Sequence, residues 1–93
     1  MLKLQSMTEE NQINLSTQQT QKKALQATLR MAQDWSKSPD TLHHAIKSYK
    51  DVIRQNPETV EAGEARIALL KIADNWDKKG QKYAAARLYK ELM

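Results

Sequence analysis

Hydrophobic residues recur at three- and four-residue steps along most of this chain, with polar residues between them. A helix completes a turn in about 3.6 residues, so this spacing collects the hydrophobic side chains on one helical face. The first stripe belongs to a stretch that starts at about residue 16 and consists of Leu25, Thr28, Leu29, Ala32 and Trp35. The second consists of Leu42, Ala45, Ile46, Tyr49, Val52 and Ile53. Both stretches are predicted to be amphipathic helices.

Two more stripes follow in the second half of the chain. The third consists of Val60, Ala65, Ala68, Leu69, Ile72, Ala73 and Trp76. The fourth consists of Ala85, Leu88, Tyr89 and Leu92. Four helical stretches joined by short turns predict an all-α fold.

Local signals place the helix boundaries. Pro39 disfavours helical geometry at Ser38, so the first helix should end there and Pro39 should begin the second, with Ser38 as its cap. Thr59 is expected to cap the third helix, with Glu61 near its positive end. Gly80 is expected to close that helix in a left-handed conformation.

Residues 1–20 are polar, with few apolar positions. Such a segment buries too little apolar surface to offset its ordering entropy, so we expect a flexible arm, or a short helix that orders on a partner. The helical domain is then predicted to cover residues 21–93.

Composition narrows the class of protein. A chain of 93 residues without cysteine suits one small domain that has neither a disulfide framework nor a thiol-based zinc or redox site. The net charge of +4 is spread among eleven acidic residues, which is typical of solvated helix faces. No apolar run is long enough to span a bilayer, and the start MLKLQSMTEENQINL lacks the features of a secretory signal, so we expect a cytoplasmic protein.

The two tryptophans reveal an internal repeat. MAQDW at residues 31–35 and IADNW at residues 72–76 align when the chain is shifted by about forty residues. The same shift, with one residue of slippage, places Ala45-x-x-x-Tyr49 on Ala85-x-x-x-Tyr89. Internal periods of this size are typical of helical-hairpin repeats.

These residues resemble the tetratricopeptide repeat family, whose first helix carries a bulky residue, a small one and an aromatic, and whose second carries Ala-x-x-x-aromatic. The resemblance implies two stacked antiparallel hairpins, over about residues 21–57 and 58–93. Small side chains would let the helices approach, and aromatic ones would fill the space between hairpins. The packing residues are then Ala32, Trp35, Ala45, Tyr49, Ala73, Trp76, Ala85 and Tyr89.

Two departures from the family pattern are visible. The period exceeds the family's usual ~34 residues, because the third helix runs further back, to Thr59. This long-helix style is similar to repeats of bacterial outer-membrane-assembly and cell-envelope proteins, which leaves a cell-envelope association open. The chain also holds two units where about three are usual, so it is alternatively a fragment of a longer array.

Catalytic and metal chemistry have little support in the sequence. His43 and His44 are adjacent, and adjacent helical residues point about 100° apart, so they do not share a metal ion in that geometry. No nucleophile–base pair, glycine-rich elbow or phosphate loop is visible. We therefore predict no enzyme activity, no cofactor, no metal site and no small-molecule substrate.

A protein partner is the remaining expectation. In the family, the inner faces of the first helices form a concave groove; carried over, this implies the groove residues Leu29, Gln33, Ser36, Ile67, Leu70, Asp74 and Asp77. The chaperone-binding members hold an acidic tail with basic and asparagine residues, which these positions lack. A mixed apolar and acidic groove favours a helix or an extended apolar-basic segment.

The sequence therefore predicts a non-catalytic adaptor, or a small accessory or scaffold subunit of a larger complex. No helix follows to cover the last one, so Leu88 and Leu92 are expected to be exposed and to form a homo-oligomer or subunit interface. The alternative is a basic nucleic-acid-associated helical domain. It is disfavoured because the basic residues of the C-terminal third lack interleaved exposed aromatics. Those basic residues are Lys71, Lys78, Lys79, Lys82, Arg87 and Lys90.

Overall fold

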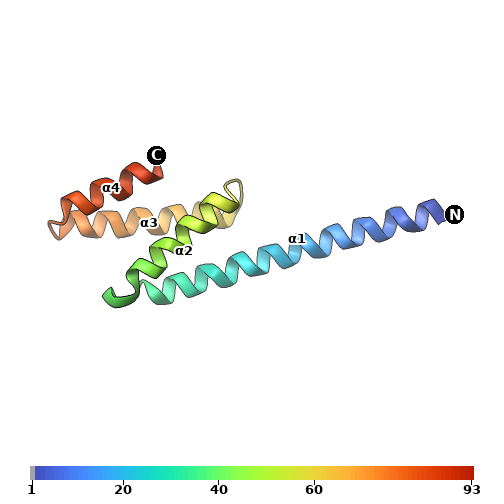
Figure 1. Ribbon diagram of the computed structural model, residues 1–93, viewed down its shortest axis with the longest axis horizontal. Helices are drawn as coiled ribbons and strands as arrows, with labels where there is room; N and C mark the ends of the chain where they lie inside the picture. The colour runs from blue at the N-terminus through green and yellow to red at the C-terminus, as the bar shows by residue number, and fades with distance from the viewer. Residues whose placement is uncertain (1) are drawn as a thin grey trace.

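The computed structural model describes the backbone of residues 2–93 and the side chains of residues 17–93. This part of the chain is all-α, as predicted, and contains no strand (Figure 1). Its elements are α1 (Leu2–Trp35), a 3₁₀ turn η1 (Pro39–Thr41), α2 (Leu42–Gln55), α3 (Val60–Lys78) and α4 (Lys82–Leu92).

The helices pack in chain order. α1 packs against α2, α2 packs against α3, and α3 and α4 lie side by side in opposite directions (Figure 1). α2 is therefore the helix that contacts both α1 and α3, and α1 also makes a smaller contact with α3. α1 begins at Leu2 rather than at about residue 16. The prediction of a flexible arm over residues 1–20 stays a prediction, and the side chains of residues 1–16 lie outside the described residues.

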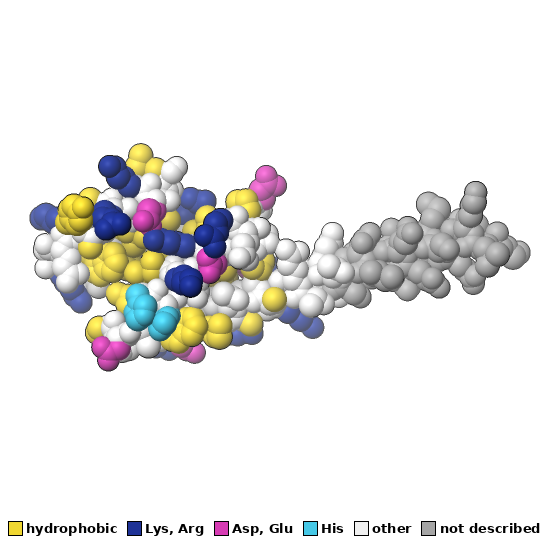
Figure 2. Space-filling model, in the orientation of Figure 1, with side chains coloured by type: hydrophobic (Ala, Val, Ile, Leu, Met, Phe, Trp, Pro, Cys, Tyr) yellow, Lys and Arg dark blue, Asp and Glu magenta, His cyan; other side chains and the backbone are white. Residues whose placement is uncertain are grey.

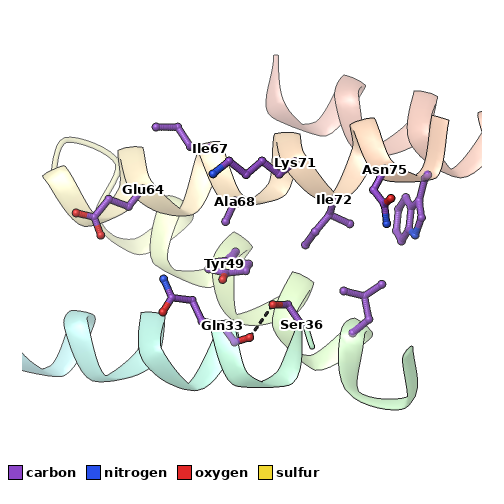
Figure 3. A pocket seen from close by; sticks show the side chains of 11 residues that line it. Gln33, Ser36, Tyr49, Glu64, Ile67, Ala68, Lys71, Ile72 and Asn75 are labelled. Carbon is purple, nitrogen blue, oxygen red and sulfur yellow. Dashed lines mark hydrogen bonds between the residues drawn. The ribbon is translucent and has the colours of Figure 1, made fainter. Parts of the chain in front are cut away.

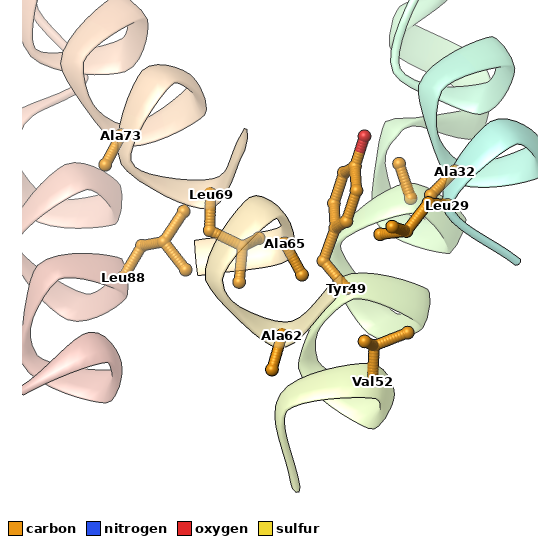
Figure 4. Close-up of a cluster of buried hydrophobic side chains, with 10 residues drawn as sticks. Leu29, Ala32, Tyr49, Val52, Ala62, Ala65, Leu69, Ala73 and Leu88 are labelled. Atoms are coloured by element: carbon orange, nitrogen blue, oxygen red, sulfur yellow. The ribbon is translucent and has the colours of Figure 1, made fainter. Parts of the chain in front are cut away.

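The core is built largely from small side chains at the helix contacts (Figure 4). Alanine at a contact lets two helix backbones approach closely, which suits a chain with few large hydrophobic residues. Leu69 is the largest side chain that is fully buried. The buried hydrophobic residues are Leu29, Ala32, Ala45, Tyr49, Val52, Ala62, Ala65, Leu69, Ala73, Ala85 and Leu88. The predicted burial of the four repeat alanines and of Tyr49 is confirmed.

The other predicted packing aromatics are less buried than expected. Trp35, Trp76 and Tyr89 are only partly buried and pack against the edge of the core. The ring of Trp35, at the end of α1, lies 5.4 Å from that of His44, centroid to centroid. Each aromatic stands at the margin of a helix contact, whereas the alanines occupy its centre.

The predicted exposure of the α4 stripe is wrong for Leu88. Leu88 is 3% exposed, because α4 lies along α3 and directs this side chain toward Leu69 (Figure 4). Leu92 is partly buried, and its carbonyl accepts a hydrogen bond of 3.0 Å from the Arg66 guanidinium. The α3–α4 contact itself thus covers most of the stripe that was expected to form an interface.

Two of the three predicted helix boundaries are confirmed. The Ala62 N–H donates to the Thr59 hydroxyl at 3.0 Å, which caps α3. Gly80 has φ of +87°, and the following N–H donates to the Trp76 carbonyl at 2.8 Å, which closes the same helix.

The predicted cap at Ser38 is wrong. Ser38 is extended, but its side chain accepts no capping hydrogen bond, and Pro39 begins η1 rather than α2. The turn is held instead by Thr41, whose hydroxyl donates to the Trp35 carbonyl at 2.6 Å. This bond ties the start of α2 to the last turn of α1.

Candidate functional site

A pocket of about 400 Å³ opens between α1 and α3, with α2 behind it (Figure 3). This volume lies in the range that binding clefts occupy, about 300–1,000 Å³. The lining residues are Gln33, Ser36, Leu42, Tyr49, Glu64, Ile67, Ala68, Lys71, Ile72, Asn75 and Trp76. The pocket therefore lies where α1 and α3 approach each other over α2.

Helical spacing explains which side chains reach the pocket. Gln33 lies in the last turn of α1, and Ser36 is the first residue after that helix, where its N–H still donates to the Ala32 carbonyl at 2.9 Å. The Ser36 hydroxyl donates to the Gln33 carbonyl at 2.7 Å, which anchors it to its own helix. On α3, Glu64, Ile67 and Asn75 belong to a set at three- and four-residue steps that lines the pocket, and Glu64 and Asn75 point toward α1 (Figure 3).

The floor of the pocket is apolar and comes from α2. Tyr49 is 3% exposed and lies between α1 and α3 (Figure 3). Burial raises the pKa of its phenol above the ordinary value of 10.0, so Tyr49 is neutral at physiological pH. Ala68 and Ile72 of α3 lie above it, and both are partly buried. The floor thus offers contact to an apolar side chain together with a neutral hydroxyl.

The rim of the pocket is polar but carries no net charge. Glu64 and Lys71 contribute one charge of each sign from α3, two turns apart. Gln33 and Asn75 contribute amide side chains from opposite walls, and each amide can both donate and accept hydrogen bonds. Such a rim is suited to the N–H and C=O groups of a peptide backbone.

Three of the predicted groove residues line this pocket. Gln33, Ser36 and Ile67 are brought together across α1 and α3, and Ile67 is 56% exposed. Leu29 does not line it, because that side chain is only 6% exposed and belongs to the core. Leu70 is 39% exposed but lies outside the pocket.

The two predicted acidic groove residues face α4 instead. Asp74 accepts a short hydrogen bond from the Tyr89 hydroxyl, and Asp77 forms an ion pair of 3.4 Å with Lys82. The Asp74 hydrogen bond, followed by burial and the negative charges of Asp74 and Asp77, raises the pKa of Tyr89 to about 12. The two acidic residues expected in the groove therefore lie outside the pocket, where the carboxylate of Glu64 is balanced by Lys71, and this changes the ligand that the pocket suits.

Several pocket residues were not among the predicted groove residues. Glu64, Lys71 and Asn75 continue the face of α3 that Ile67 occupies, so extending that residue's spacing along the helix would have found them. Tyr49 was assigned to packing alone, yet it is both core and pocket floor. A residue of the second helix reaches the pocket because α2 lies behind the gap between α1 and α3.

The two histidine rings lie against each other on the surface. The ring centroids of His43 and His44 are 4.0 Å apart with the planes tilted by 39°, and the centroid of His44 is 5.4 Å from that of Trp35. No group of three or more His, Cys, Asp or Glu side chains placed to hold a metal ion occurs among the described residues.

Comparison with protein-family models, curated proteins and solved structures finds no match for this chain. Within the described residues, no helix combines the length and the apolar character needed to cross a membrane.

Proposed function

We propose that this chain is a non-catalytic protein-interaction module that holds a peptide segment of a partner in the α1–α3 pocket. The observation that carries the proposal is the pocket's composition: an apolar floor at Tyr49 beneath a polar rim that carries no net charge. Binding sites of this kind combine apolar contact with a few polar groups that fix orientation. An adaptor, or an accessory subunit of a larger complex, is the class of protein that uses such a surface.

The pocket favours an extended segment with one apolar side chain. That side chain would rest on Tyr49 and Ile72, while Gln33 and Asn75 bind the segment's backbone from both walls. A basic segment, which the sequence favoured, has no acidic cluster to meet here, because Asp74 and Asp77 interact with α4. The proposed ligand is therefore apolar and uncharged.

The repeat resemblance supports the same assignment. Alanine lies at both helix contacts that the repeat predicts, and the pocket lies between the first helices of the two hairpins, where the family has its concave groove. We propose that the two hairpins are tetratricopeptide-like units, either as an independent module or as part of a longer array.

Peptide selection on the intact chain tests the proposal. A random twelve-residue phage-display library supplies the ligands, and synthetic, fluorescein-labelled copies of the enriched peptides then serve as probes for fluorescence anisotropy. Ile67→Ser should weaken binding at least tenfold, because it removes the exposed apolar wall of the pocket. Gln33→Ala should weaken it severalfold through lost backbone hydrogen bonds.

Val60→Ser is the matched control, since Val60 is a branched, exposed side chain of the same helix that does not line the pocket. Its binding should stay within twofold of the parent chain. Ile67 and Val60 are 56% and 71% exposed, so neither variant threatens the fold. The proposal fails if no peptide is enriched, or if Ile67→Ser and Val60→Ser bind equally well.

A further inference from the structure

A second concave surface lies between α2 and α4 and shares one lining residue, Trp76, with the α1–α3 pocket. Three adjoining hollows of about 390, 220 and 300 Å³ share one lining residue, Lys50, and together form what we term the α2–α4 cleft. The cleft follows α2 from His43 to Arg54 and reaches α4 at Arg87 and Leu92.

The α2–α4 cleft is cationic. Lys and Arg side chains gather over α2 and α4 on the face shown in Figure 2, around hydrophobic side chains. Five basic side chains and two carboxylates line it, a net charge of +3 with His43 neutral. The basic residues are Lys47, Lys50, Arg54, Arg66 and Arg87, and the acidic ones are Asp51 and Glu91. Much of the chain's excess positive charge is therefore concentrated at one surface.

The cations differ in their availability. Arg54 pairs with Asp51 at 2.6 Å on the same helix, and Lys50 forms an ion pair with Glu91 across the cleft. Within the described residues, Lys47 and Arg87 have neither an ion pair nor a hydrogen-bond partner. An anionic ligand would therefore meet two free cations, one on each wall.

The floor between these cations is apolar. Ile46 and Ile53 of α2 and Leu92 of α4 line the cleft, and each is partly buried. On α2, Lys47, Lys50 and Arg54 follow steps of three and four residues and therefore share one face. Cations and hydrophobic side chains thus alternate along the cleft with helical periodicity.

We propose that the α2–α4 cleft docks an acidic amphipathic helix of a protein partner. Carboxylates one turn apart on such a helix match the cations on α2, whose successive turns are about 5.4 Å apart. Its apolar face would cover Ile46 and Ile53, so charge and hydrophobic contact act on the same ligand. This surface shares only Trp76 with the peptide pocket and would give the proposed module a second partner.

The aliphatic side chains of the floor favour a helix over a nucleic-acid ligand. Nucleic-acid binding draws on phosphate contacts and on bases stacked against aromatic rings, neither of which uses isoleucine. The aliphatic floor at Ile46, Ile53 and Leu92 would stay uncovered beneath a phosphate backbone. A helix with leucines beside its carboxylates uses both features of the cleft.

Glu91 competes with such a ligand. Its carboxylate forms an ion pair with Lys50. Lys50 lines all three hollows and therefore lies at the middle of the cleft. An incoming carboxylate must displace Glu91 before it can pair with Lys50. Removing the charge of Glu91 should therefore increase affinity for an acidic helix, whereas a structural role alone would not predict a tighter complex.

Anisotropy with defined probes tests the proposal. The first probe is a fluorescein-labelled fifteen-residue helix-forming peptide with glutamates at three- and four-residue steps beside leucines. The second has the same composition in scrambled order, and the third is a fifteen-nucleotide oligothymidine. At an ionic strength near 0.15 M, where the Debye length is about 8 Å, the amphipathic peptide should bind at least tenfold more tightly than either of the others.

Matched variants of the intact chain locate the binding. Lys47→Glu with Arg87→Glu should weaken peptide binding at least tenfold, whereas Lys22→Glu with Arg30→Glu, the same charge change at exposed positions of α1, should stay within twofold. Glu91→Gln should tighten binding about threefold, and Ile53→Ser should weaken it about fivefold. Ile67→Ser should leave it unchanged, which separates this surface from the α1–α3 pocket.

The opposite results would overturn the proposal. If the amphipathic and scrambled peptides bound with equal affinity, binding would be nonspecific charge attraction and not docking of a helix. Tighter binding of the oligothymidine, unaffected by Ile53→Ser, would assign the cleft to nucleic acid. The α2–α4 cleft would not be a docking site if the amphipathic peptide failed to bind at millimolar concentration. The same conclusion would follow if the α2–α4 and α1 charge variants lost equal affinity for the peptide.

Discussion

Leu69 and Leu70 are the same residue type at neighbouring positions of one helix, yet only Leu69 is fully buried. Leu69 is 0% exposed and Leu70 is 39% exposed. Leu69 lies between Leu88 of α4 and the part of the core that faces α2 (Figure 4). Leu69→Ala removes buried methyl groups and leaves a cavity, which costs about 2.7–5.0 kcal/mol of unfolding free energy at buried leucines. We expect a value near 3 kcal/mol here.

The matched variant Leu70→Ala should cost less than about 1 kcal/mol, because water already reaches that side chain and occupies the space that it leaves. Any difference in helix propensity between leucine and alanine is common to both variants and cancels. In a domain of this size about 1 kcal/mol shifts the melting temperature by 4–8 °C, so Leu69→Ala should melt about 12–24 °C lower.

Urea unfolding of both variants, followed by circular dichroism and by tryptophan fluorescence, measures the difference. Coincident transitions by the two probes establish that the unfolding is two-state. Equal losses for Leu69→Ala and Leu70→Ala would refute the placement of the core between α3 and α4.

Three further predictions concern local structure. Gly63→Ala should stabilise the chain by about 0.5–1 kcal/mol, since Gly63 is helical and has open space around its Cβ position. Gly80→Ala should destabilise it by about 1–2 kcal/mol, because φ at Gly80 is +87°. Urea unfolding should therefore give changes of opposite sign in the unfolding free energy of the two variants. Thr59→Ala should cost about 1 kcal/mol by removing the α3 cap, and Thr59→Ser should restore most of it; equal stability of the two variants would argue against the cap. Asp74→Asn should lower the Tyr89 pKa from about 12 toward its ordinary value in a phenolate absorbance titration. Since folding raises this pKa, the stability contributed by the Tyr89–Asp74 contact should be present below pH ~10 and lost as the pH rises toward about 12. An unfolding free energy that stays unchanged over that pH range would contradict a stabilising role for this contact.

The helices were predictable because their signals are local. Hydrophobic spacing predicted α2, α3 and α4, and Thr59 and Gly80 marked the two ends of α3, where the chain offers a hydroxyl and a residue free to adopt positive φ. The prediction at Ser38 was wrong because Pro39 begins the 3₁₀ turn η1 rather than α2, and the Ser38 side chain accepts no capping hydrogen bond there. Whether a side-chain oxygen caps a helix depends on the geometry of the turn, and a one-dimensional pattern does not settle that geometry.

The candidate site was only partly predictable because it depends on how the helices are rotated. Gln33 and Ile67 were placed in the groove by the repeat resemblance, and both line the pocket, but Leu29 lies in the core and Asp74 faces α4. Positions on one helix differ by 100° per residue, so a small rotation decides whether a side chain lines a groove or enters the core. Tyr49 lines the pocket because its own helix, α2, lies behind the gap between α1 and α3.

Trp76 forms part of the wall of both the α1–α3 pocket and the α2–α4 cleft. One indole side chain thus contributes to both of the surfaces that we propose as binding sites. If both proposed ligands contact Trp76, binding of one should change the affinity for the other, and linkage requires the two effects to be equal.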